Sequence, residues 1–344
     1  MRKAEIVKHT LIFKTPGGTS RGVLHEKPAW FIILREDEKT GVGECSLLPK
    51  LSLDDRPDFE SRLREICRAW ESGAEMGQLN EHPSIRFGME TALRSLSSYS
   101  PFMLYPSPFT RGAEKIEING LVWMGSKLEM QSRIREKLNS GFHCIKLKIG
   151  AIDFEAEMNL LKAIRREYDS SEIEIRVDAN GAFSPENALE KLSRLAELDL
   201  HSIEQPIKQG QWEEMARLCA ASPIDIALDE ELIAITERDK KMEMLRTIKP
   251  QAIVIKPGLV GGIASTKEWI EAAQKTDSYF WLTSALESNV GLNAIAQFTA
   301  TLQPELPQGL GTGSLYTNNI ESPLEVEGKY LTYKPEKRWE FPYL

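Results

Sequence analysis

Cysteine and histidine are scarce in this chain of 344 residues. The four cysteines (Cys45, Cys67, Cys144 and Cys219) lie far apart and form no Cys-x-x-Cys motif, and the five histidines do not cluster. Neither residue type therefore forms a metal-ligand pattern, and we expect isolated, reduced thiols, as in a cytoplasmic protein. If the chain binds a metal ion, carboxylate groups must hold it.

Long apolar runs and an excess of positive charge are also lacking. The first ten residues contain no apolar stretch of signal-peptide length, and no later window approaches a membrane span. The formal net charge of −8 argues against binding to a nucleic-acid backbone. We therefore expect a cytoplasmic protein with a small-molecule partner, and with neither nucleic acid nor membrane as a partner. The oligomeric state is not indicated.

The first hundred or so residues predict a small α+β domain, which we place at 1–110. Alternating apolar residues indicate antiparallel strands at 6–13 and 30–35, and the Gly- and Thr-rich residues 15–22 indicate a loop. Helical periodicity follows at 58–72 and 84–97, and a Pro-rich connection occupies 101–108.

From about residue 115, short β-rich runs alternate with amphipathic helical runs. Eight runs indicate strands, at 116–123, 144–149, 173–178, 202–204, 225–229, 252–256, 279–284 and 308–311. Eight strands that alternate with helices predict a closed parallel (β/α) barrel over 111–314. The alternative is an open doubly wound sheet, but no Gly-x-Gly-x-x-Gly follows the first strand.

Three successive strands of the predicted barrel end in a carboxylate: Asp178, Glu204 and Asp229. Strand ends meet at one rim of a parallel barrel, so the three side chains should converge. Converging carboxylates repel one another unless a cation lies between them, and Mg²⁺, with Mn²⁺ as a possible substitute, suits oxygen ligands. Taken singly, each acid could instead be a helix N-cap.

Lysines occupy the second and sixth predicted strands. Lys146 and Lys148 are two residues apart, so they share one face of the second strand, while Ile145 and Leu147 take the other. Two lysines directed into a barrel should lower each other's pKa, which suits a general base. The alternative is an exposed edge strand with solvated lysines. Lys256 ends the sixth strand, across the barrel.

This order of lysines and acids along the chain resembles the muconate-lactonizing subgroup of the enolase superfamily. The resemblance implies a modified (β/α)7β TIM-like barrel with an N-terminal α+β capping domain, on which a C-terminal segment at about 315–344 packs back. Within the subgroup the chain is similar to the o-succinylbenzoate synthase family. The similar stretches are 19–23, 41–46, 176–180 and 309–312.

That resemblance implies a carbon–oxygen lyase (hydro-lyase) of menaquinone biosynthesis. It would dehydrate 2-succinyl-6-hydroxy-2,4-cyclohexadiene-1-carboxylate to 2-succinylbenzoate, with Mg²⁺ on the three acids binding the ring carboxylate. Lys148 would be the base that later protonates the departing hydroxide, Lys256 would stabilise the enediolate, and Lys146 would modulate Lys148. The residues expected to contact the substrate are Ser20, Arg21, Arg176, Ser284, Glu287, Ser288, Gly311 and Thr312.

Two other functions remain open. A dipeptide epimerase or N-acylamino acid racemase of the same superfamily would use the opposed lysines equally well. However, dipeptide epimerases carry an Asp-x-Asp at the eighth strand, where this chain reads Gly-Leu-Gly-Thr at 309–312. The second is a barrel that has lost catalysis and serves as a binding protein or scaffold, but such a protein would not need the lysines and acids.

Overall fold

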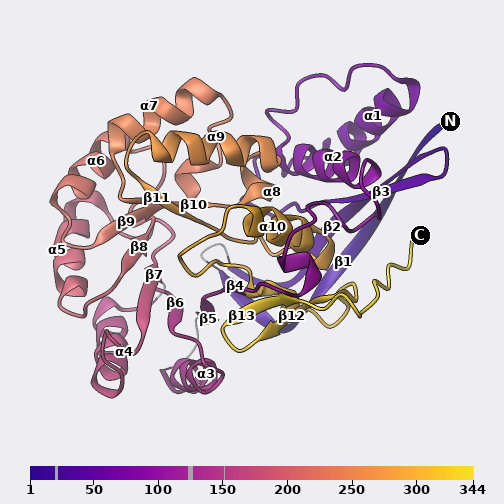
Figure 1. Cartoon of the computed structure of the whole chain (residues 1–344). Coiled ribbons are helices and arrows are strands. Elements are labelled where there is room, and N and C mark those ends of the chain that lie inside the picture. Colours follow the sequence, from indigo (N-terminus) through magenta and orange to yellow (C-terminus); the bar gives the residue numbers. More distant parts are fainter. Residues whose placement is uncertain (20–21, 123–126, 151) are drawn as a thin grey trace.

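The computed structural model describes residues 1–19, 22–122, 127–150 and 152–344. Its strands form an antiparallel sheet of three near the N-terminus, a parallel sheet of seven, and a further antiparallel sheet of three that involves the C-terminal segment. Figure 1 shows the first sheet beside two helices on one side of the molecule, and the parallel sheet inside a ring of helices on the other.

The N-terminal sheet consists of β1 (Arg2–Thr19), β2 (Gly22–Glu36) and β3 (Lys39–Cys45). One face of β2 packs on α1 (Phe59–Ser72) and α2 (Pro83–Leu96), and alternate residues on its other face contact the C-terminal segment. Because both faces are buried, the centre of β2 is continuously apolar rather than alternating. Gly43 lets β3 lie against α2, since a Cβ there would be 2.1 Å from the Gly88 carbonyl oxygen.

The prediction of a loop at 15–22 is wrong for the residues of this range that the structure describes. β1 continues to Thr19 and β2 begins at Gly22, with Gly17 paired to Leu24 after a shift of register that follows Ile12. Backbone hydrogen bonding across the hairpin therefore outweighs the low strand propensity of these small residues.

The parallel sheet has the order β11-β10-β9-β8-β7-β6-β5. Its strands are β5 (Gly120–Val122), β6 (Cys144–Lys148), β7 (Glu174–Asp178), β8 (Ser202–Glu204), β9 (Asp225–Leu228), β10 (Ala252–Ile255) and β11 (Tyr279–Leu282). The helices around it are α3 (Lys127–Asn139), α4 (Phe154–Glu167), α5 (Pro185–Ala196), α6 (Trp212–Ala221), α7 (Arg238–Ile248), α8 (Pro257–Val260), α9 (Gly262–Gln274) and α10 (Asn289–Thr301). The predicted alternation of strand and helix is confirmed.

The first and last predicted strands of the barrel differ from expectation. The predicted strand 116–123 is split, because β4 (Ile116–Glu117) pairs with the C-terminal hairpin and only β5 joins the parallel sheet. In place of an eighth strand, Gln308 forms a parallel bridge to Ile118, and Gly309 forms one to Thr283. These two bridges link the two edges of the seven-stranded sheet, so closure rests on a segment too short to be assigned as a strand.

The C-terminal segment returns to the N-terminal sheet. It contains β12 (Leu324–Glu327) and β13 (Tyr330–Tyr333), and Figure 1 shows it beside β1. Tyr316 forms a bridge with Phe13, and the rings of Phe31 and Phe341 lie 5.1 Å apart. These are contacts between the N-terminal sheet and the segment at 315–344; the boundaries of the capping and barrel domains stay a prediction.

The connection at 101–108 is bound to the barrel rather than free. The Gln297 side chain on α10 accepts hydrogen bonds from the backbone N–H groups of Leu104 and Tyr105, and it donates one to the carbonyl of Phe102. The described helices include none that combines the length and the hydropathy of a membrane span.

Candidate active site

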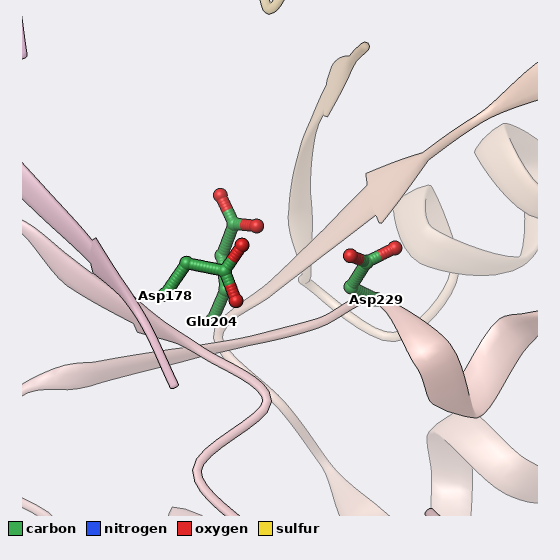
Figure 2. Close-up of side chains that lie close together, drawn as sticks. All are labelled: Asp178, Glu204 and Asp229. Carbon is green, nitrogen blue, oxygen red and sulfur yellow. The ribbon is translucent and has the colours of Figure 1, made fainter. Parts of the chain in front are cut away.

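Three carboxylates converge where β7, β8 and β9 end. Asp178 is the last residue of β7 and pairs in register with Glu204, the last residue of β8, while Asp229 follows β9. One oxygen from each lies within 4.8 Å of the others, and all three side chains are buried. Figure 2 shows the three groups extending from neighbouring strand ends. The arrangement could hold a metal ion.

Lysines flank these carboxylates on two sides. From β6, the Lys146 ammonium contacts Glu204 and lies 3.0 Å from Asp178 Oδ2, and Lys148 Nζ lies 2.8 Å from the same oxygen. From the end of β10, Lys256 Nζ donates to Asp229 Oδ2 at 2.5 Å. Because β6 and β10 lie on opposite sides of β7, β8 and β9 in the sheet, the lysines approach the three acids from two directions.

The predicted lowering of pKa by the lysine pair is wrong for Lys146. Burial by itself lowers the pKa of Lys146, but the charges of Asp178, Glu204 and Asp229 outweigh burial and raise it. Burial also lowers the pKa of Lys256, but the charges of Asp229 and Glu230 outweigh burial and raise it. Strand alternation placed the lysines correctly but did not reveal that each would face carboxylates.

The acids respond unequally to this packing. Burial favours a higher pKa for Asp178, but Lys146 and Lys148 outweigh it and hold the pKa well below the ordinary value. Burial raises the pKa of Glu204 to about 7, opposed by Lys146 and assisted by the two neighbouring acids. Glu204 Oε1 is also buried with no hydrogen-bond partner among the described residues. Of the three acids, Glu204 is therefore the one that the neighbouring lysines neutralise least completely.

Two polar residues of the site were not predicted from the sequence. Asn180 Oδ1 accepts a hydrogen bond from Lys148 Nζ at 2.6 Å, and Asn180 Nδ2 donates to Glu230 Oε1 at 3.0 Å. Each lies within two residues of a predicted metal ligand, Asn180 after Asp178 and Glu230 after Asp229. This proximity along the chain was the available signal.

A cavity of about 590 Å³ opens onto the lysines and Asp178. Ser284, Gly311 and Thr312, predicted to contact the substrate, line it. Other residues that line the cavity were not predicted from the sequence. They include Lys14, Leu48, Lys50, Leu51, Arg133, Lys137, Asn180, Glu230 and Leu286. Side chains from the N-terminal sheet and its following loop therefore form part of the wall.

The other predicted substrate contacts are placed differently. Arg176 lies one layer below Asp178 in the barrel, donates to Glu174 Oε1 at 2.7 Å and lies over the Trp281 ring. Glu287 and Ser288 are buried and bonded to other protein groups, outside the residues that line the cavity. Ser20 and Arg21 lie outside the described residues. Substrate contact by these five residues stays a prediction.

Comparisons with known proteins match two parts of the chain to two family models. Residues 1–96 match the family model described as MenC, N-terminal domain, and residues 129–337 match the one described as Enolase C-terminal domain-like. The second match covers more than half of the chain.

Matches to curated relatives and to solved structures cover nearly the whole length of this chain. An o-succinylbenzoate synthase of Desulfotalea psychrophila is 48% identical, with 93% of this chain and 96% of the relative aligned, and one of Vibrio cholerae is 26% identical over 94% and 93%. The crystal structure of MenC from D. psychrophila matches with a TM-score of 0.84 and 44% identity, covering 96% of this chain and 99% of that one.

The L-Ala-D/L-Glu epimerase of Bacillus subtilis has a TM-score of 0.82, with 96% of this chain and 95% of that one covered. At 18% identity it shows the shared fold alone. The predicted (β/α) barrel with an N-terminal α+β part is thereby confirmed. The family models, the near-full-length identity and the site geometry agree that this chain belongs to the o-succinylbenzoate synthase family of the enolase superfamily.

Proposed function

We propose that this chain is an o-succinylbenzoate synthase of menaquinone biosynthesis. It dehydrates 2-succinyl-6-hydroxy-2,4-cyclohexadiene-1-carboxylate to 2-succinylbenzoate in a Mg²⁺-dependent reaction. The observation that carries this proposal is the set of three buried carboxylates with lysines on both sides at the wall of one cavity. Membership of the family supplies the substrate.

Asp178, Glu204 and Asp229 are the residues that would hold Mg²⁺. The fit is good, because all three donors are carboxylate oxygens, which Mg²⁺ and Mn²⁺ prefer. The buried Glu204 oxygen without a hydrogen-bond partner in the described chain is the kind of atom that a cation would satisfy. When bound, the ion supplies positive charge that stabilises a carboxylate as its α-proton is lost.

Lys148 is the proposed base. Its amine takes the ring proton next to the carboxylate, and it returns that proton to the departing hydroxyl group, which leaves as water. A C–H and a C–O bond break and the ring becomes aromatic, so the reaction needs no oxidant. Asp178 and Asn180 orient the Lys148 Nζ from two directions.

Lys256 and Lys146 are proposed to act electrostatically. The Lys256 ammonium reaches the site from the opposite side to Lys148 and would stabilise negative charge on the substrate as the proton leaves. Lys146 contacts Glu204 and Asp178, so it fixes the acids beside which Lys148 works. Ser284, Gly311 and Thr312 are proposed to contact the substrate from the cavity wall.

The test is an absorbance assay for the aromatic product with purified protein, the cyclohexadiene substrate and Mg²⁺. We expect turnover that stops on addition of EDTA and returns with Mg²⁺ or Mn²⁺. Full activity in EDTA would contradict the metal site. The epimerase alternative is tested in parallel with dipeptides in D₂O: α-deuterium incorporation without formation of aromatic product would favour it.

A further inference from the structure

A second cluster of buried charges lies where the N-terminal sheet meets the barrel. Lys27 on β2 and Glu44 on β3 come from the N-terminal part, and Glu287 comes from the turn between β11 and α10. All three side chains are 0% exposed. A fully buried charged side chain is costly unless it is paired or hydrogen-bonded, so each of these requires an explanation.

Most polar atoms of the cluster are hydrogen-bonded, but Glu287 Oε1 is buried without a hydrogen-bond partner among the described residues. Lys27 Nζ donates to Ser46 Oγ at 2.8 Å. Glu44 accepts hydrogen bonds from the N–H and the hydroxyl of Ser288 and from the N–H of Gly291. A carboxylate from the N-terminal sheet thus caps the start of α10, so the cluster joins the two parts of the molecule.

Glu287 holds the turn that precedes α10. Its Oε2 accepts from the Ser284 hydroxyl and from the Ala285 N–H, each at 2.6 Å. Within this turn Leu286 has a φ of +64°, a left-handed conformation that a leucine rarely adopts and that its surroundings must impose. The turn is therefore kept in shape by the Glu287 carboxylate.

The same turn forms part of the active-site wall. Ser284, Ala285 and Leu286 line the cavity, and Thr312 donates from its own place on that wall to Ser284 Oγ at 2.8 Å. Glu287 Oε1 faces Gly258, two residues beyond Lys256: a Cβ on Gly258 would lie 2.7 Å from that oxygen. Movement of Glu287 would thus disturb the 284–286 section of the wall and the backbone that follows Lys256.

The three charged groups gather around two glycines. A Cβ on Gly291 would lie 2.7 Å from Glu287 Cγ and 2.9 Å from Glu44 Oε2, and the Cβ of Ser46, whose hydroxyl accepts from Lys27, would lie 3.8 Å from a Cβ on Gly258. Burial raises the pKa of Glu287, and the Lys27 ammonium opposes that rise. Burial lowers the pKa of Lys27, and Glu44 and Glu287 oppose that fall. Two buried carboxylates therefore share the field of one buried ammonium group, and loss of that group would leave both without it.

We propose that Lys27 is a positioning residue of the active site. Its buried ammonium group, carried by the N-terminal sheet, keeps Glu287 in place, and Glu287 in turn sets the Ser284–Ser288 turn at the cavity wall. The link to catalysis rests on the proposed function, whereas the link between Lys27 and the turn does not.

The test compares Lys27→Met with Lys241→Met. Lys241 is the matched control, because it is also fully buried and donates to a serine hydroxyl (Ser265), but it pairs with Glu268 away from the cavity. Hydrogen exchange is followed for peptides covering 284–291, and kcat and KM are measured with the cyclohexadiene substrate.

For Lys27→Met we expect exchange at 284–291 to be at least tenfold faster, with peptides of α6 unchanged and kcat/KM at least tenfold lower. Lys241→Met should alter exchange near α7 and α9 and keep kcat/KM within twofold of the parent. Unchanged exchange at 284–291 in Lys27→Met, or an equal rise in all peptides, would overturn the proposal.

The double variant Lys27→Met/Glu287→Gln separates the effect of the lost charge from the effect of altered packing. It also replaces Lys27→Met in the test if that variant does not fold. Removal of the uncompensated Glu287 charge should restore part of the protection at 284–291. The electrostatic link would be refuted if residues 284–291 exchanged as fast in the double variant as in Lys27→Met. If Lys27→Met is unfolded, the comparison is with Glu287→Gln alone, and protection no better than in that variant would refute the link. An inactive parent protein would refute the proposed function, and the exchange measurements would still decide the role of Lys27.

Discussion

Lys146 and Lys148 show how much two identical residues on one strand can differ. They share the inward face of β6, but Lys146 contacts two carboxylates, whereas Lys148 contacts one carboxylate and the Asn180 amide. The alternation of side chains along a strand predicts only that both lysines lie on the same face, and it does not distinguish one from the other. Their partners on β7 and β8 distinguish them, which supports the assignment of the proton transfer to Lys148.

Replacement of Lys148 by alanine should lower kcat by about 10²–10⁴-fold, the usual contribution of a general base. Mg²⁺ binding, measured by titration calorimetry, should persist, because Asp178, Glu204 and Asp229 remain. Lys275→Ala, at an exposed residue just after α9, is the control and should keep full activity. A Lys148→Ala protein within tenfold of parental kcat would rule Lys148 out as the base.

At the scale of elements, α2 and α9 are joined by a cap that neither helix provides alone. α9 begins at Gly262 without a side-chain cap from its own N-cap residue. Instead Glu90 on α2 accepts hydrogen bonds from the N–H groups of Ile263 and Ala264, at 2.7 and 2.8 Å. A negative side chain at a helix N-terminus is stabilising, so this contact fixes the N-terminal part against the barrel.

Glu90→Ala should therefore lower the free energy of unfolding by about 1–2 kcal/mol, the typical loss for a helix cap. Glu90→Gln should cost less, since its carbonyl oxygen can still accept a hydrogen bond. Urea unfolding followed by circular dichroism measures both. In each variant kcat should stay at the parental value, because Glu90 does not line the cavity; equal stability of Glu90→Ala and the parent would contradict the capping role.

Over the whole molecule, all four thiols are buried and none forms a disulfide. Burial raises the pKa of Cys67 and Cys219 to about 12, and it raises the pKa of Cys45 and Cys144 well above the ordinary value. That the thiols are reduced in the cell stays a prediction. Thiol reactivity requires the thiolate, so the folded chain should be inert to thiol reagents.

At pH 8 we expect no reaction of the native protein with a small aromatic disulfide reagent, and reaction of all four thiols in urea. Unfolded thiols ionise near about pH 8.5. Because Cys67 and Cys219 ionise near 12 when folded, their contribution to stability is complete below about pH 8.5 and is lost as the pH rises toward 12. The urea midpoint should accordingly fall between pH 8 and pH 10.

The double variant Cys67→Ala/Cys219→Ala is the control for this pH dependence. Its urea midpoint should fall less between pH 8 and pH 10 than that of the parent. An identical fall in both proteins would show that other groups, such as the buried tyrosines, produce the alkaline loss of stability.

Much of the molecule could be predicted because it depends on rules that act over a few residues. Alternation along β6 placed Lys146 and Lys148 on one face, and the regular spacing of Asp178, Glu204 and Asp229 placed them on consecutive strands. The barrel, its order of strands and the three acids at one rim follow from such local patterns.

What only the tertiary structure decided are the contacts between distant segments. The predicted first strand was divided because Ile116 pairs with Leu331, and the pKa of Lys146 rose because three other strand ends face it. Glu44 reaches Ser288, 244 residues later, and no pattern in either segment indicates the other. The sequence by itself thus determined which chemical groups line the barrel rim, since strand periodicity is local. Their charge states and supporting residues were decided by packing, since electrostatic energies depend on distances that only the folded chain defines.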